Sequence, residues 1–209
     1  METEDIFKKI SGLNMPGLIL LAARPGMGKT FFALNMARIV AEKKTAAVFS
    51  LEMSREQVAA RLLALAPPAE NKRTCAGTIY IDDNPALSVA DIHAKCCQLD
   101  NLGLVVIDYV QLITWNQGGE NRRQFAGETS RMLKIMAKEL TVPVLCLSQL
   151  SRVTEERENK RPILSDLRES ESFVSEADIV LSLYQDSYYN EDLKKRNSVE
   201  CLVSDIARS

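Results

Sequence analysis

The sequence has no long apolar run, almost no net charge and few residues that hold metals. None of its hydrophobic stretches approaches the roughly 18 residues that a membrane span needs, so we expect no membrane partner. The formal net charge of −2 excludes a protein that is basic as a whole, and any contact with nucleic acid must come from local loops. The opening METEDIFKKI is acidic and amphipathic, unlike a secretory signal peptide. These absences predict a cytoplasmic protein.

Cysteine and histidine are too few and too scattered to predict a metal centre. The cysteines form no Cys-x-x-Cys pair and are expected to be reduced thiols; they are Cys75, Cys96, Cys97, Cys146 and Cys201. Cys96 and Cys97 are adjacent, so they point in different directions on a helix, and no further ligand stands nearby. His93 is the only histidine, and we expect it at the surface rather than in a catalytic site.

Short apolar runs alternate with longer amphipathic ones along the chain. The apolar runs predict strands at residues 17–23, 45–52, 78–81, 102–113, 142–150, 177–184 and 198–203. Apolar residues at helical spacing predict helices at 30–43, 54–66, 88–99 and 125–140. Ser54 with Gln57 forms a capping-box pattern, and Ser88 is a candidate N-cap. This alternation predicts an α/β domain with a mainly parallel twisted sheet flanked by helices. The polar segment 151–162 is a long loop, and such loops in compact domains are often functional.

The segment LLAARPGMGKTFFALNMA has the layout of a phosphate-binding loop. A buried strand precedes it and a helix follows, so that backbone N–H groups and the helix N-terminus converge on phosphate. Lys29 would reach the outer phosphates, and Thr30 would offer its hydroxyl to Mg²⁺. Ala23 stands where such loops begin with glycine; this costs conformational freedom but keeps the amide donors. The alternative is an ordinary strand-to-helix turn. The predicted cradle comprises Ala23, Arg24, Pro25, Gly26, Met27, Gly28, Lys29 and Thr30.

Three polar residues stand at the carboxyl ends of predicted strands, which face the ligand crevice in open α/β sheets. Asp108 is a candidate Mg²⁺ ligand, directly or through water, or else an ordinary strand-end aspartate. Glu52 is a candidate base that orients the attacking water, or else a helix-start carboxylate. Gln149 is a candidate γ-phosphate contact, or else a loop hydrogen-bonding residue.

These segments, with RMLKIMAKELTVPVLCLSQLSR, RPILSDLRES and ADIVLSLYQDSYYN, resemble the RecA-like ATPase domain of the DnaB-type replicative helicases. The resemblance runs in order from about Gly17 to about Asn190, and that family also tends to have alanine in the place of Ala23. It implies a RecA-like P-loop NTPase fold. It also implies a homo-oligomeric ring that binds ATP and Mg²⁺ between neighbours and moves on single-stranded DNA, with a loader and a primase as partners.

The resemblance also implies a role for each matching residue. Lys29 and Thr30 hold phosphates and Mg²⁺, Glu52 is the catalytic base, Asp108 is the Walker B acid and Gln149 is the γ-phosphate sensor. In SDLRES, Arg168 and Glu169 take the positions of the DNA-contacting loop. The chain divides into a helix or linker remnant at 1–16 and the ATPase domain at 17–209. The family's N-terminal helical domain is therefore expected to be absent.

The sequence departs from this family in the parts that act on DNA or on a neighbouring subunit. The family's last strand leads into Lys-x-Arg, whose arginine is the finger that reaches the neighbour's ATP. Here Asp205 and Ala207 occupy these slots, and Arg208 comes one residue late, on the other strand face unless the register slips. Loss of such a finger costs about 10³ in rate. Glu171 replaces a glycine of the DNA loop, where a carboxylate opposes phosphate.

Two smaller departures are Gln185, in place of an arginine, and the segment LAPPAENKRTCAG, which is shorter than in the family.

The motifs and the departures together indicate two alternative functions. The first is an ATP-dependent helicase motor. The alternative is an ATP-binding DnaB-like paralogue without motor activity that joins or regulates a replication ring. Another RecA-like ATPase, such as a recombinase or a clock-type ATPase, resembles the SQLSR and SDLRES segments less closely. A phosphate-loop kinase would need an acceptor-binding segment, and none is visible.

Overall fold

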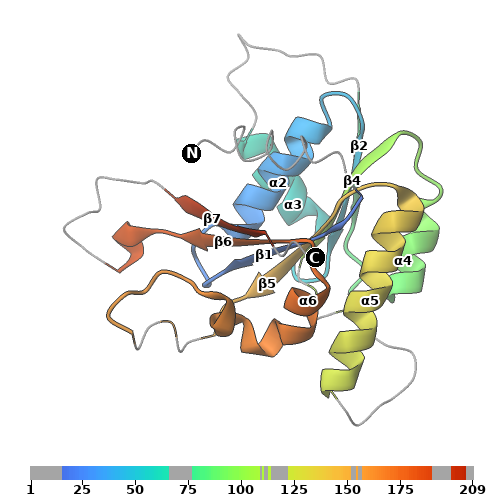
Figure 1. The fold of residues 1–209 in the computed structure, drawn as a ribbon. Helices are drawn as coiled ribbons and strands as arrows, with labels where there is room; N and C mark the ends of the chain where they lie inside the picture. Colours follow the sequence, from blue (N-terminus) through green and yellow to red (C-terminus); the bar gives the residue numbers. More distant parts are fainter. Residues whose placement is uncertain are drawn as a thin grey trace.

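A twisted, seven-stranded sheet runs through the part of the protein that the structure describes (Figure 1). The computed structural model describes residues 16–65, 77–108, 110, 113, 122–151, 154, 157–189 and 199–205. Neighbouring strands are parallel except for the β6–β7 pair. The strands in sheet order are β3 (Ile79–Asp82), β2 (Thr45–Ser50), β4 (Leu102–Asp108), β5 (Val144–Gln149), β1 (Leu18–Ala23), β6 (Ile179–Tyr184) and β7 (Glu200–Asp205). The predicted α/β class and mainly parallel sheet are confirmed.

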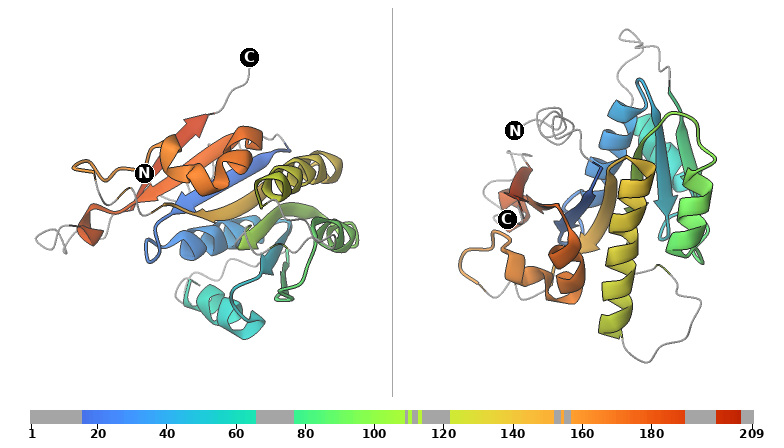
Figure 2. Two further views of the ribbon diagram at one scale, coloured as in Figure 1. Left: turned by 90° about the horizontal axis from the view of Figure 1, so that it is seen from below. Right: turned by 45° about the vertical axis from the view of Figure 1, so that its right-hand side comes forward.

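Helices cover both faces of the sheet (Figure 2). On one face lie α2 (Lys29–Val40) and α3 (Arg55–Ala64); on the other lie α4 (Val89–Cys96), α5 (Arg122–Leu140) and α6 (Glu171–Glu176). Alternate residues of β1 divide between the two cores. Leu18, Leu20 and Ala22 pack with α4, α5 and α6, while Ile19, Leu21 and Ala23 pack with α2 and α3. A strand buried on both faces reads as one continuous apolar run, which is the pattern that the sequence shows.

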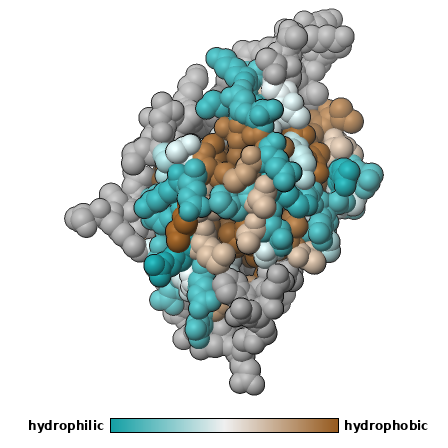
Figure 3. Space-filling view, turned by 90° about the vertical axis from the view of Figure 1, so that its right-hand side faces the viewer, coloured by the Kyte–Doolittle hydropathy of each residue, from teal (hydrophilic) through white to brown (hydrophobic). Residues whose placement is uncertain are grey.

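The outer surface of α4 and α5 mixes polar and apolar residues (Figure 3). Leu133 and Met136 of α5 are buried against the sheet, whereas Arg131 and Lys138 are exposed. Ile135 of α5 is 45% exposed. Across the described ranges, no helix combines the length and the apolar character needed to cross a membrane.

Several predicted boundaries are wrong by a few residues, and one of them by more. The strand predicted at 102–113 ends at Asp108, because pairing with β2 stops at the Ser50–Asp108 register position; Val110 and Ile113 are buried outside the strand. Likewise β2 ends at Ser50, two residues before Glu52. The short segment η4 (Leu164–Ser170) and helix α6 were not predicted, because the polar sequence there has no clear period. Residues 1–15, which make up most of the predicted linker remnant, lie outside the described part.

Candidate nucleotide-binding site

The loop between β1 and α2 has the backbone of a phosphate cradle. Gly26 and Gly28 both have φ of +82°, a left-handed conformation that other residues adopt only with strain. Gly28 is the N-cap of α2 and contributes no side chain. The positive dipole end of a 12-residue helix therefore opens directly onto the loop.

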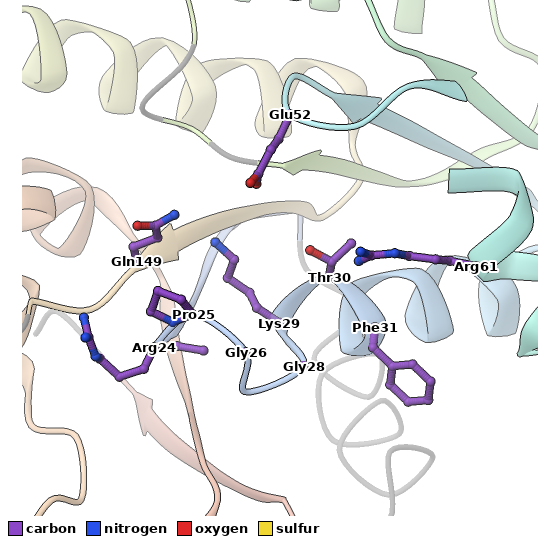
Figure 4. Close-up of a pocket in the computed structure, with 11 residues that line it drawn as sticks. Arg24, Pro25, Gly26, Gly28, Lys29, Thr30, Phe31, Glu52, Arg61 and Gln149 are labelled. Carbon is purple, nitrogen blue, oxygen red and sulfur yellow. The ribbon is translucent and has the colours of Figure 1, made fainter. Parts of the chain in front are cut away.

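A cavity of about 330 Å³ lies over this loop (Figure 4). Its walls come from the ends of β1 and β5, the segment after β2, and helices α2 and α3. Met27 is the one predicted cradle residue missing from the lining: its side chain is buried in the core and its N–H donates to the Arg24 carbonyl at 3.2 Å. The lining residues are Ala23, Arg24, Pro25, Gly26, Gly28, Lys29, Thr30, Phe31, Glu52, Arg61 and Gln149.

Lys29 extends from the loop into the space between Glu52 and Gln149 (Figure 4). Burial lowers the pKa of its ammonium group, because the charged form loses hydration. The negative charges of Asp108 and Glu52 act in the opposite direction and raise this pKa. A bound triphosphate would add negative charge beside the Lys29 ammonium group, which burial has deprived of much of its hydration.

Asp108 and Thr30 meet beneath the cavity. The Thr30 hydroxyl donates to Asp108 Oδ2 at 2.7 Å, and Asp108 is only 3% exposed. The second oxygen, Oδ1, is buried and has no hydrogen-bond partner among the described residues, an arrangement that proteins usually avoid. A hard cation with oxygen ligands would satisfy this atom, so the pair fits Mg²⁺. No group of three or more His, Cys, Asp or Glu side chains in the described ranges could hold a metal. The remaining ligands would thus be water and phosphate oxygens.

Glu52 and Gln149 reach the cavity from the segment after β2 and from the end of β5, which lie on either side of β4. Gln149 is paired in register with Ala23, so the end of β5 lies beside the start of the phosphate loop. Glu52 follows Leu51, whose N–H donates to the Asp108 carbonyl at 2.7 Å. Both side chains are exposed and line the cavity. The structure therefore brings together the candidate base, sensor, acid and cradle.

Arg61 of α3 is a cavity residue that sequence reasoning missed. Its side chain points toward Thr30 (Figure 4). The predicted capping box at the start of α3 is confirmed, since Ser54 and Gln57 exchange hydrogen bonds. Asp83, beyond β3, also accepts from the Arg55 N–H at 2.9 Å. The available signal was the position of α3 directly after Glu52, which starts the helix at the cavity edge.

The residues assigned to DNA and to a neighbouring subunit are less fully described. The backbone of Arg168 and Glu169 lies in η4, which contributes no lining residue, and their side chains are outside the described part. Glu171 is exposed at the first position of α6. The backbone of Asp205 ends β7, while Ala207 and Arg208 lie outside the described residues.

The histidine and the described cysteines lie away from the cavity. His93 on α4 contacts Glu139 of α5 at 3.5 Å. Cys96 is buried and Cys97 is exposed, so the two thiols do point apart; burial raises the pKa of Cys96 to about 12. Cys75 lies outside the described residues.

Known proteins are similar to this chain in both sequence and fold. The sequence profile of the DnaB-like helicase C terminal domain matches residues 2–78 and 69–207. The two matched ranges overlap at residues 69–78, within and next to the segment LAPPAENKRTCAG that is shorter than in the family. The chain is 45% identical to "Replicative DNA helicase DnaB" of Geobacillus stearothermophilus and 42% identical to "Replicative DNA helicase DnaC" of Bacillus subtilis. Each alignment covers 96% of this chain and 50% of the relative, so the chain spans about half the length of these relatives.

Solved structures agree with this comparison. A solved structure described as an ATPase domain is 33% identical, with a TM-score of 0.79 over 91% of this chain and 77% of that one. A structure titled "The Structure Of A DnaB-Like Replicative Helicase And Its Interactions With Primase" is 34% identical, with a TM-score of 0.82 over 91% of this chain and 52% of that one. The RadB recombinase, at 16% identity and a TM-score of 0.53, shares the fold alone.

Proposed function

Since the chain belongs to the family of DnaB-like helicase C-terminal domains, we propose that it is the ATP-hydrolysing part of a replicative DNA helicase. It would bind ATP with Mg²⁺ in the cavity over the phosphate loop and use hydrolysis to move along single-stranded DNA. The observation that carries this proposal is the Thr30–Asp108 pair, with its partnerless buried oxygen, beside a glycine-rich loop that begins a helix. The protein would act in the cytoplasm.

Six residues in or beside the cavity have a role in this proposal. Lys29 binds the outer phosphates, and Asp108 holds the cation beside the Thr30 hydroxyl. Mg²⁺, when bound, would neutralise part of the charge on the phosphates. Glu52 accepts a proton from the attacking water, and Gln149 donates its amide hydrogen to the γ-phosphate. Arg61 adds a second cation from α3 to balance the charge that develops on the phosphoryl oxygens.

Contacts with DNA and with other subunits complete the proposal. Arg168 and Glu169 in η4 would contact single-stranded DNA, and copies of the chain would form a ring in which a neighbour supplies the arginine finger. A loader and a primase are the proposed partners; one similar solved structure bears a title that names primase. No described feature favours the alternative of an ATP-binding paralogue without motor activity. Of the residues on which that alternative rests, Ala207 and Arg208 lie outside the described ranges, while Asp205 ends β7 and Glu171 begins α6.

The decisive experiment is steady-state ATP hydrolysis against protein concentration, with and without single-stranded DNA. We expect a rate per subunit that rises with concentration and increases further with DNA, because neighbours complete each other's sites. Lys29→Ala should weaken nucleotide binding by about one to two orders of magnitude, since contacts with charged groups contribute about 1.5–3 kcal/mol. Lys138→Ala, an exposed lysine near the end of α5, is the matched control and should bind normally. A flat rate near zero with ATP still bound would contradict the motor function. Unchanged affinity in the Lys29 variant would contradict the site itself.

A further inference from the structure

The end of β5 is held against the phosphate loop by the residue that follows Gln149. The Leu150 N–H donates to the Ala23 carbonyl at 3.1 Å, and the Leu150 carbonyl accepts from Arg24 Nη1 at 2.9 Å. Leu150 is 3% exposed, so water competes little for these bonds. A displacement of Gln149 therefore changes the hydrogen bonds of Leu150, and a displacement of the phosphate loop moves Leu150 with it.

The next residue passes this connection to η4. The Ser151 N–H donates to the backbone carbonyl of Asp166 at 3.1 Å. Asp166 lies in the same seven-residue segment as Arg168 and Glu169. Three consecutive residues, Gln149 to Ser151, thus contact the cavity, the phosphate loop and η4 in turn.

The Asp166 carboxylate is buried and fully engaged. Arg157 donates to it through both terminal nitrogens, at 3.0 Å to Oδ1 and 2.7 Å to Oδ2. The Ile163 N–H donates to Oδ2 at 2.9 Å and closes the start of η4, and the side chain of Asp166 is 3% exposed. Arg157 also donates to the Arg161 carbonyl at 2.9 Å. One aspartate therefore holds the end of β5, the start of η4 and the loop between them.

Two pairs in this region differ in how much they constrain the backbone. The bidentate pair of Arg157 and Asp166 has a defined geometry, with side chains 29% and 3% exposed, and removing the arginine leaves a buried carboxylate uncompensated. The neighbouring Arg161–Glu200 pair has side chains 46% and 44% exposed, and exposed pairs contribute little. Beyond Asp166, Leu167 is 1% exposed, which fixes the segment on its other side. Two successive residues of η4, Asp166 and Leu167, are therefore buried and held by their surroundings.

We propose that Arg157 and Asp166 are positioning residues that transmit the nucleotide state at Gln149 to the DNA-facing segment η4. The inference rests on the proposed function, in which Gln149 contacts the γ-phosphate. The physical route is Gln149, Leu150 and Ser151 along the chain, then the hydrogen bond to Asp166, whose carboxylate is held by Arg157. A contiguous hydrogen-bond network couples the nucleotide site to η4 only if breaking the network changes how η4 responds to nucleotide. The test measures that response directly.

The test is amide hydrogen exchange of the whole chain, with and without a non-hydrolysable ATP analogue and Mg²⁺. Residues 24–31 report nucleotide binding, and residues 163–170 report the response of η4. In the unchanged protein the analogue should alter exchange in both segments, by about fivefold or more at η4. Arg157→Gln combined with Asp166→Asn removes both charges and avoids a lone buried carboxylate, so this variant should fold. It should keep the response at 24–31 and lose most of the response at η4.

The control is Arg161→Gln, which makes the same charge change in the same loop but breaks only the exposed pair with Glu200. It should keep both responses. If the double variant keeps the full η4 response, or if η4 of the unchanged protein does not respond while residues 24–31 do, the inference is overturned and the nucleotide site stands. If residues 24–31 do not respond in the unchanged protein, the proposed function fails, and the inference fails with it.

Discussion

Lys29 is a cation held where water is scarce, and its protonation should control nucleotide affinity. Burial lowers its pKa in the free protein, and phosphate would raise that pKa again in the complex. Below the lowered pKa, affinity should not depend on Lys29 titration. Above it, the free protein carries a neutral amine that must take up a proton on binding, so Kd should rise about tenfold per pH unit.

The measurement is Kd for a non-hydrolysable ATP analogue from about pH 7 to about pH 10, the range below the usual lysine pKa. Melting temperatures at each pH provide the control. The lowered pKa of Lys29 also affects the stability of the free protein, which should rise with pH while nucleotide affinity falls. Between the folded and unfolded pKa values the unfolded chain binds more protons, so the Lys29 contribution makes the free protein more stable as pH rises. A Kd that stays flat while the protein remains folded would mean that the pKa of Lys29 in the free protein lies above the measured range.

The sequence predicted the positions of those candidate residues that are set by the local pattern. Lys29 and Thr30 follow the glycines of the loop directly, and Asp108 ends an apolar strand, so pattern and spacing sufficed. Arg61 was missed because its approach to the cavity depends on contacts distant in sequence. The start of α3 is held by Asp83 beyond β3, and on the helix alone Arg61 resembles any exposed polar residue.

At the scale of elements, the most informative difference is the unpredicted helix α6. Glu171 was expected to be a loop residue in a glycine position, but it begins a helix, where a carboxylate favours the positive end of the dipole. Phe173 of this helix is 3% exposed against the core. A single buried aromatic residue in a polar segment gives no periodic signal, so only tertiary packing defines this element.

This position leads to a prediction for DNA binding. Glu171→Gln should strengthen binding of single-stranded DNA by about threefold or more at low salt, because it removes a negative charge near the phosphates, and added salt should shrink the gain. Glu171→Gly should act in the same direction but should also cost about 0.5–1 kcal/mol in stability, because glycine is unfavourable in a helix. Titration of labelled oligonucleotide at several salt concentrations provides the measurement.

The matched control for this prediction is Glu176→Gln, which makes the same charge change at the other end of α6. That variant should leave the affinity within about twofold. Equal gains in both variants would mean that overall charge, and not the position of Glu171, sets DNA affinity. No gain in either would mean that α6 does not face DNA.

For the molecule as a whole, the candidate nucleotide site brings together strands that are distant along the chain. The sheet order places the carboxyl ends of β1, β4 and β5 side by side, so the phosphate loop, Asp108 and Gln149 meet at one edge. The loops that follow parallel strands lie at one edge of the sheet, which is why the fold class and the meeting of these candidate residues at one edge were both predictable. The details that were not predictable, such as η4 and the Arg157–Asp166 pair, depend on side-chain contacts across the loop that follows β5.

Ligand that binds at this edge should stabilise the entire domain. At 100 times Kd, the ATP analogue with Mg²⁺ should add about 2.7 kcal/mol, which corresponds to a rise of about 5–10 °C in Tm for a chain of this size. Asp108→Asn should abolish the part of this rise that depends on Mg²⁺, because a neutral amide replaces the carboxylate that would hold the cation. Melting curves with analogue, with and without a chelator, separate the two contributions. If chelation lowers the rise equally in the unchanged protein and in the Asp108 variant, the cation is held elsewhere, and the buried Oδ1 of Asp108 has another role.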